Sequence, residues 1–267
     1  MAVFVLTSAT GSPGTTTTAV GLTLSWPRDV LLADCDREPS QAIQAGYLRG
    51  ADLGGRGLAT VARLHRERQP VAPHLLQMSL PIKRQETELA RHFLPGFSQP
   101  GAVRLFEHVW PELSTAFSRL DEAGADVIVD AGHVGRDGLP LALLAEADAV
   151  SLVTRTSLRA LASARLYLGL LREQLDSLPA ARPLGMMLVG PGRPYSAAEI
   201  VAQFDVPCWG EVPFHERHAA VLSDGEDEPR RFPDTNLMNQ LRIIASRLAE
   251  RLHHQQSVHH QPGMQYV

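Results

Sequence analysis

A glycine-rich loop between a strand pattern and a helix pattern is the segment of this chain best suited to chemistry. The apolar run at residues 3–6 precedes the loop A-T-G-S-P-G-T-T-T-T at residues 9–18, and a helical pattern begins at residue 16. Backbone N–H groups in such a turn, at the N-terminus of a helix, form an anion site. The loop therefore predicts phosphate binding, and the alternative is an ordinary strand-to-helix turn rich in Gly and Thr.

The loop has the backbone of a phosphate site without its usual cation. The phosphate-binding motif ends in G-K-[ST], where Lys reaches the phosphates and the hydroxyl binds Mg²⁺. Thr15 stands in the place of that Lys, and Thr16 stands in the place of the magnesium ligand. Gly11 and Gly14 allow backbone to approach a phosphate closely. The residues predicted to contact the phosphates are Gly11, Ser12, Pro13, Gly14, Thr15, Thr16 and Thr17.

Two carboxylates follow the second apolar run. Residues 30–33 lead directly to Asp34, and Asp36 comes two positions later. In a continuing strand, this spacing places both side chains on one face. Beside a phosphate they would order a water molecule or Mg²⁺, and we predict that Asp36 acts in catalysis. The alternative is a pair of loop aspartates that make turn hydrogen bonds.

A third apolar run, at residues 126–129, ends at Asp130 and a glycine-rich turn. A carboxylate in this place suits a magnesium ligand that acts through water. We therefore predict that Thr16, Asp34 and Asp130 hold the metal. His133, in the turn, has two interpretations, a hydrogen-bonded turn residue or a catalytic base.

Apolar runs alternate with helical patterns along the chain. We expect strands at residues 3–6, 30–33, 92–94, 126–129, 149–153, 184–189 and 208–212. We expect helices at residues 16–24, 57–67, 103–123, 139–145, 158–175, 197–204 and 236–253. Continuous apolar runs are typical of strands buried on both faces of a parallel sheet. The pattern predicts an α/β fold, a doubly wound and mostly parallel sheet with helices on both faces. Ligands in such a fold bind at the carboxyl ends of the strands.

Length and composition set the limits of the fold. A chain of 267 residues with 44% hydrophobic residues can form one α/β domain, which we place at residues 1–253. Residues 254–267 are polar, and we expect a disordered tail. The two cysteines are too few for a disulfide framework. Since the N-terminus shows no signal-peptide pattern, we expect a cytoplasmic protein.

Together, these segments resemble the ParA/MinD superfamily of deviant-Walker-A P-loop ATPases. The family's loop has the form K-G-G-x-G-K-T-T, and this chain has T-G-S-P-G-T-T-T at residues 10–17. The family's D-x-D strand end is matched by residues 34–36, and its Walker B carboxylate by Asp130. The run at residues 206–214 resembles the family's strand and I-P turn near the adenine, which implies that Pro213 contacts the base. The resemblance covers the chain to about residue 253 and implies a P-loop NTPase-like fold that binds ATP or ADP with Mg²⁺.

Both lysines of the family's loop are replaced, by Thr10 and Thr15. In the family, the second lysine neutralises the β- and γ-phosphates, and the first reaches the partner subunit's nucleotide. A charge-assisted hydrogen bond contributes about 1.5–3 kcal/mol, and a cation that meets developing charge matters more to hydrolysis. The resemblance therefore implies a degenerate member, a pseudo-ATPase with weak or absent hydrolysis. The arginines considered as substitutes are Arg37, Arg136, Arg155 and Arg193.

The resemblance implies a switch or scaffold that positions a cellular apparatus, such as pilus or secretion machinery or a chromosome or division component. The loop and the L-P-G run at residues 94–96 are similar to the CpaE/TadZ type. One alternative is an active ATPase in DNA partition or cell division, with a substitute for the loop lysine. A less favoured alternative is a metabolic P-loop enzyme, such as an ATP-dependent amidoligase.

The expected partners follow from the resemblance and from charge. The family implies a homodimer and a protein partner from an assembly or partition apparatus. The net charge of −4 does not favour nucleic acid. The apolar stripe of the helix at residues 236–253 is expected to pack on the sheet rather than to bind a membrane directly.

Overall fold

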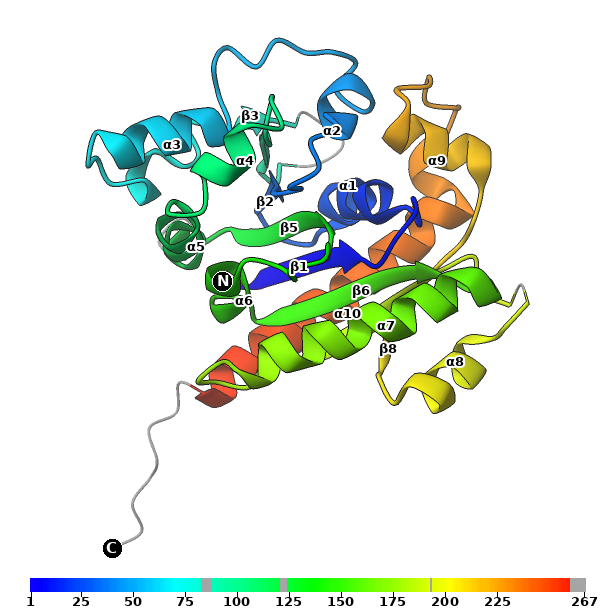
Figure 1. Cartoon of the computed structure of the whole chain (residues 1–267). Coiled ribbons are helices and arrows are strands. Elements are labelled where there is room, and N and C mark those ends of the chain that lie inside the picture. Colours follow the sequence, from blue (N-terminus) through cyan, green and yellow to red (C-terminus); the bar gives the residue numbers. More distant parts are fainter. Residues whose placement is uncertain (83–87, 121–123, 193, 260–267) are drawn as a thin grey trace, which may run out of the picture.

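An eight-stranded sheet organises the computed structural model, which describes residues 1–82, 88–120, 124–192 and 194–259 (Figure 1). The strand order is β3-β4-β2-β5-β1-β6-β7-β8, and all neighbours are parallel except β3 and β4. The strands are β1 (Val3–Ser8), β2 (Val30–Asp34), β3 (Leu80–Pro81), β4 (Arg91–Leu94), β5 (Asp126–His133), β6 (Ala149–Arg155), β7 (Leu184–Val189) and β8 (Cys208–Val212). The predicted α/β fold with a mostly parallel sheet is confirmed.

Helices cover both faces of the sheet. They are α1 (Thr15–Ser25), α2 (Ala42–Ala45), α3 (Leu58–Arg66), α4 (Ala102–Leu105), α5 (Trp110–Ser118), α6 (Leu141–Ala145), α7 (Leu158–Asp176), α8 (Ala197–Phe204), α9 (Glu216–Ser223) and α10 (Asn236–His259), with short 3₁₀ turns at Ala72–His74 and Phe232–Asp234. Alternate residues of β1 point to opposite faces. Val3 and Val5 join the core under α3, α5, α6 and α7. Phe4 and Leu6 join the core under α1, α9 and α10.

The C-terminal helix packs on the sheet as predicted. Its apolar stripe is buried against α1 and β8, and the stripe residues are Leu237, Leu241, Ile244, Leu248 and Leu252. The helix continues through His259, past the end predicted at residue 253. The prediction of a disordered tail from residue 254 is therefore wrong for residues 254–259. Residues 260–267 lie outside the described residues.

One predicted helix is in fact two. The helix expected at residues 103–123 is divided into α4 and α5, and residues 121–123 lie outside the described part of the chain. Pro111 occupies the first turn of α5. Proline has no N–H to donate to the preceding turn, so a continuous helix is interrupted here. The short helices α2 and α9 and strand β3 were not predicted.

None of the helices in the described ranges combines the length and the apolarity that crossing a bilayer requires.

Candidate nucleotide-binding site

The glycine loop joins β1 to α1 at the carboxyl edge of the sheet. Gly11 and Gly14 have positive φ values, 73° and 101°, where glycine is favoured. A Cβ atom added to either glycine would meet no atom within 4 Å, so both open onto free space. Gly14 precedes α1, and no side chain caps that helix. The first N–H groups of α1 are therefore available to an anion.

Thr15 carries a polar atom without a partner. The residue is 6% exposed, and its Oγ1 is buried with no hydrogen bond among the described residues. A buried hydroxyl without a partner is costly. Because Thr15 lines the cavity beside the loop, a bound phosphate oxygen would satisfy this hydroxyl.

The carboxylates predicted at two strand ends come together at this edge. Asp34 and Asp130 stand opposite each other in the parallel pairing of β2 with β5. The Thr16 hydroxyl donates a hydrogen bond to the Asp130 carboxylate, and the Gly132 N–H donates another at 3.1 Å. Thr16, Asp34 and Asp130, the predicted metal ligands, therefore lie at one edge of the sheet.

Asp36 takes a different position from the one predicted. Strand β2 ends at Asp34, so the two carboxylates do not share a strand face. The Asp36 N–H instead donates to Asp34 Oδ1 at 3.2 Å, and the Glu38 N–H donates to Asp36 Oδ1 at 2.9 Å. This is the turn hydrogen bonding left open as the alternative. The turn nevertheless carries Asp36 to the wall of the cavity beside the loop.

Desolvation dominates the electrostatics of these carboxylates. Burial raises the pKa of Asp34 to about 8, and the nearby Asp130 charge adds to the shift. Burial raises the pKa of Asp130 to about 6, although hydrogen bonds from Thr16 and Gly132 oppose the shift. Burial also raises the pKa of Asp36. Clustered carboxylates with raised pKa values attract a counter-charge, and the oxygen ligands present here are those that Mg²⁺ prefers.

His133 braces the loop. Its Nε2 lies 2.5 Å from the Gly11 carbonyl oxygen, and its Nδ1 lies 3.3 Å from Glu38 Oε2. Of the two interpretations of His133, these contacts favour the hydrogen-bonded turn residue. The ring ties the turn after β5 to the loop after β1.

A cavity of about 660 Å³, here called the loop cavity, lies beside the glycine loop. Its walls include the loop from Gly11 to Thr18, Asp36 and His133, and the predicted base contact Pro213. Among the described residues that line it, Arg155 is the one arginine or lysine. The volume falls within the range typical of small-molecule sites.

The fit of the residues to a nucleotide with Mg²⁺ is good. The positive-φ glycines, the uncapped start of α1 and the unpartnered Thr15 hydroxyl would hold phosphate oxygens. Thr16 and the neighbouring carboxylates Asp34 and Asp130 would hold the metal. In the described ranges, no three His, Cys, Asp or Glu side chains form a metal cluster on their own. Mg²⁺ ordinarily combines one or two carboxylates with substrate phosphates and water.

The fold and the loop together define the P-loop class of nucleotide-binding architectures. No protein-family model matches the chain, and no curated protein matches its sequence. Solved structures do match. The chain is similar to a ParA family ATPase from Chlorobium tepidum TLS, with a TM-score of 0.71 and 17% identity over 92% of this chain and 98% of that chain.

Two nucleotide complexes are also similar. One is the septum site-determining protein MinD from Pyrococcus horikoshii OT3 complexed with Mg-ADP, with a TM-score of 0.66 and 17% identity over 94% of this chain and 96% of that chain. The other is a putative plasmid partition protein from Borrelia burgdorferi B31 bound to AMPPNP, with a TM-score of 0.64 and 14% identity over 94% and 98%. The chain has the fold of the ParA and MinD ATPases.

At two positions of the site, the neighbouring carboxylates leave room only for glycine, and the sequence did not predict this. A Cβ atom on Gly96 would lie 2.6 Å from Asp34 Cγ, and one on Gly132 would lie 2.0 Å from Asp36 Oδ1. Both distances are too short for any larger residue. The L-P-G run at residues 94–96 was the available signal for Gly96, but only as a family resemblance.

Proposed function

We propose that this chain is a cytoplasmic nucleotide-binding switch or scaffold, formed by one domain that extends through the end of α10 at residue 259. In this proposal, it binds ATP or ADP with Mg²⁺ and hydrolyses ATP weakly or not at all. The observation that carries the proposal is the loop cavity, where phosphate-binding backbone surrounds Thr15 instead of a lysine. The solved structures with Mg-ADP and AMPPNP support a nucleotide as the ligand of this fold.

Each site residue has a proposed role in binding. The loop residues from Gly11 to Thr17 hold the phosphates, and Pro213 contacts the base. Thr16, Asp34 and Asp130 position Mg²⁺, which neutralises phosphate charge when bound. Asp36 orients a water molecule beside the terminal phosphate. Without a lysine at Thr15, the site loses a cation aimed at developing charge, which is where electrostatic catalysis has its largest effect.

A positioning role requires partners, and we propose a homodimer and a further protein partner. Helix α7 supports an interaction surface because Leu158 and Leu166 are 66% and 75% exposed. Thr10 is exposed and directly precedes Gly11, which lines the loop cavity, and we propose that a second subunit approaches the nucleotide from this side. Pilus or secretion machinery and a chromosome or division component are the proposed cargo classes. Direct contact with nucleic acid or membrane is not part of this proposal.

Isothermal titration with Mg-ATP, together with ATP turnover assays, tests the proposal. We expect the wild-type chain to bind Mg-ATP, with turnover at or near background. Thr15→Lys should bind about ten- to a hundred-fold more tightly, because it restores one charge-assisted bond to phosphate. No detectable binding by the wild-type chain would exclude a nucleotide switch.

The competing hypothesis is an active ATPase, and the arginine on the cavity wall, Arg155, is the observation that favours it. Asp36→Ala separates the two hypotheses. Wild-type turnover that Asp36→Ala abolishes would establish the active ATPase and end the pseudo-ATPase proposal. A matched control is Asp52→Ala, because Asp52 is exposed and does not line the loop cavity.

A further inference from the structure

The replaced lysines leave the loop cavity in need of a cation, and the structure separates the four arginines considered for it. The Arg37 guanidinium donates to the carbonyl oxygens of Val134 and Gly138, so it is committed to the turn after β5. The Arg136 side chain is 92% exposed beside Asp137 and does not line the cavity. Arg193 lies outside the described residues. Arg155 lines the cavity wall.

Sheet topology brings Arg155 to the loop. Strand β6 runs parallel to β1, and Val153 pairs with Ser8 at the end of β1. Arg155 is the last residue of β6, two positions beyond that pair. The chain therefore delivers this arginine to the sheet edge beside the start of the glycine loop.

Arg155 rests on an aromatic ring. Its Cζ lies 4.6 Å from the centroid of the Phe214 ring, and Phe214 is 54% exposed. Among the described residues, no carboxylate lies within ion-pair distance of Arg155. An exposed cation–π contact is weak compared with a charge-assisted bond to phosphate, so the guanidinium can exchange one for the other.

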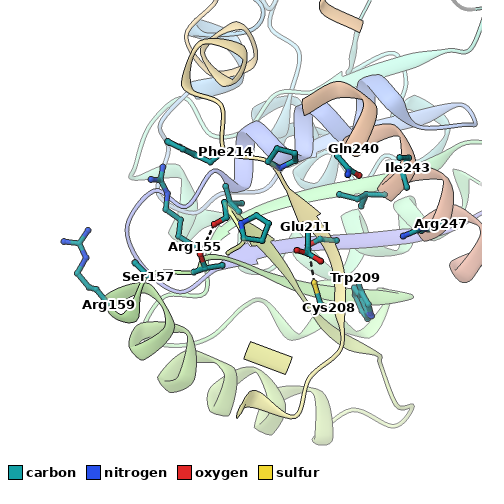
Figure 2. A pocket seen from close by; sticks show the side chains of 17 residues that line it. Arg155, Ser157, Arg159, Cys208, Trp209, Glu211, Phe214, Gln240, Ile243 and Arg247 are labelled. Carbon is teal, nitrogen blue, oxygen red and sulfur yellow. Dashed lines mark hydrogen bonds between the residues drawn. The ribbon is translucent and has the colours of Figure 1, made fainter. Parts of the chain in front are cut away.

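A second cavity shares this pair of side chains. This hollow, here called the edge cavity, has a volume of about 810 Å³ and lies along β8 and α10. Figure 2 shows Arg155 extending toward Phe214 at one end of it, with Arg159 at the start of α7 and pointing away from that ring. Arg155 and Phe214 line both cavities, whereas Arg159 lines only the edge cavity. Arg159 is therefore a natural control for Arg155.

We propose that Arg155 supplies the phosphate-binding cation that the loop lacks, moving from the Phe214 ring to a phosphate of a nucleotide in the loop cavity. This inference rests on the proposed function, because it takes the nucleotide site as given. It assigns the missing charge to a strand end outside the glycine loop. Arginine is suited to this role because its planar guanidinium can bond two phosphate oxygens at once.

Isothermal titration of the full chain with Mg-ATP, at low and at high NaCl, tests the assignment. Arg155→Ala should weaken binding about ten- to a hundred-fold. Arg155→Lys should recover part of the affinity, because it keeps the charge but not the planar guanidinium. Arg159→Ala should bind like the wild-type chain. The affinity of Arg155→Ala should also fall less with added salt, because one ionic contact with phosphate is gone.

The outcomes separate this inference from the proposed function. If the wild-type chain binds Mg-ATP and Arg155→Ala binds it with an affinity within twofold of wild type, the role of Arg155 is overturned and the proposed nucleotide switch still holds. Absence of wild-type binding would overturn both. Equal losses in Arg155→Ala and Arg155→Lys would show that shape, not charge, matters here and would also overturn the assignment. Circular dichroism of each variant establishes that the fold is intact, and Arg155→Gln serves as the neutral variant if Arg155→Ala does not fold.

Discussion

Strand β5 carries two buried aspartates, Asp126 at its amino end and Asp130 in its carboxyl half, and their surroundings differ. Asp126, at the amino end, is fully buried and accepts hydrogen bonds from the Ala2 N–H at 2.8 Å and the Trp26 indole at 2.9 Å. His253 Nε2 lies 3.0 Å from it, and Arg28 Nε lies 3.4 Å from it. This carboxylate joins the N-terminus, α1 and α10.

Asp130, four residues further along the same strand, is surrounded differently. It receives one backbone N–H and the Thr16 hydroxyl, and it lies near the Asp34 and Asp36 carboxylates. The pKa of Asp130 is raised, mainly by burial. A satisfied carboxylate stabilises the fold, whereas clustered carboxylates with raised pKa values destabilise it unless a counter-charge binds. We therefore expect Asp126 to contribute to the stability of the fold and Asp130 to ligand binding.

The largest expected effect is at the amino end. Asp126→Ala leaves the Trp26 indole and the Ala2 N–H without an acceptor, so we expect the free energy of unfolding to fall by about 3–5 kcal/mol. Urea denaturation followed by circular dichroism measures the loss. Asp130→Ala, on the same strand, is the matched control and should lose less stability, because it also removes one of several clustered carboxylates. Equal losses in both variants would remove the distinction between the two aspartates.

The next largest effect is a pH-dependent gain in the free energy of unfolding, at Asp34 on the carboxyl edge of the sheet. The folded pKa of Asp34 is raised above its unfolded value, so folding favours its protonated form. Its contribution to stability is full below about pH 4 and is lost as pH rises through about 8. Asp34→Asn removes this loss. At pH 9 the free energy of unfolding of the variant should therefore exceed that of the wild-type chain by on the order of a few kcal/mol.

Thermal unfolding without nucleotide or Mg²⁺ at pH 5 and pH 9 measures this gain. The difference between Asp34→Asn and the wild-type chain should be larger at pH 9. A variant that is less stable than the wild-type chain at pH 9 would show that the Asp34 charge already has a compensating partner.

The smallest expected effect tests how much His253 contributes to stabilising Asp126 at the amino end of β5. His253→Ala removes one partner of Asp126 and leaves the Ala2 and Trp26 donors in place, so we expect a loss of about 1 kcal/mol. Urea denaturation measures it. His254→Ala, at the next and exposed position, should change stability little. A His253→Ala loss as large as that of Asp126→Ala would mean that the histidine, not the backbone and indole donors, stabilises this carboxylate.

The sequence predicted the carboxyl edge better than the amino edge. The loop, Asp34 and Asp130 each follow an apolar run, and parallel strands bring such ends together. Asp126 was assigned only as the first residue of a strand, because its partners Ala2, Trp26 and His253 are scattered along the chain. No local pattern announces a contact between residues 2 and 126 or between residues 126 and 253.

The same reasoning explains the errors in the prediction. Helix periodicity ran across Pro111, and the break between α4 and α5 depends on one missing N–H group. Asp36 was expected on the strand face, but β2 ends two residues earlier, at Asp34. Helix α2 contains only four residues, too few to show a period. Long, strongly apolar elements were predicted well because burial on the sheet determines them.

The shared wall of the two cavities has a further consequence. One guanidinium cannot occupy both hollows at once, so any molecule that draws Arg155 toward the glycine loop withdraws it from the space along β8 and α10. Thermodynamic linkage makes such an effect reciprocal. If a ligand in one cavity changes the affinity of the other cavity for its ligand by some factor, the second ligand changes the affinity for the first by the same factor. A single arginine side chain can thereby couple ligand binding at two adjoining sites without a rearrangement of the backbone.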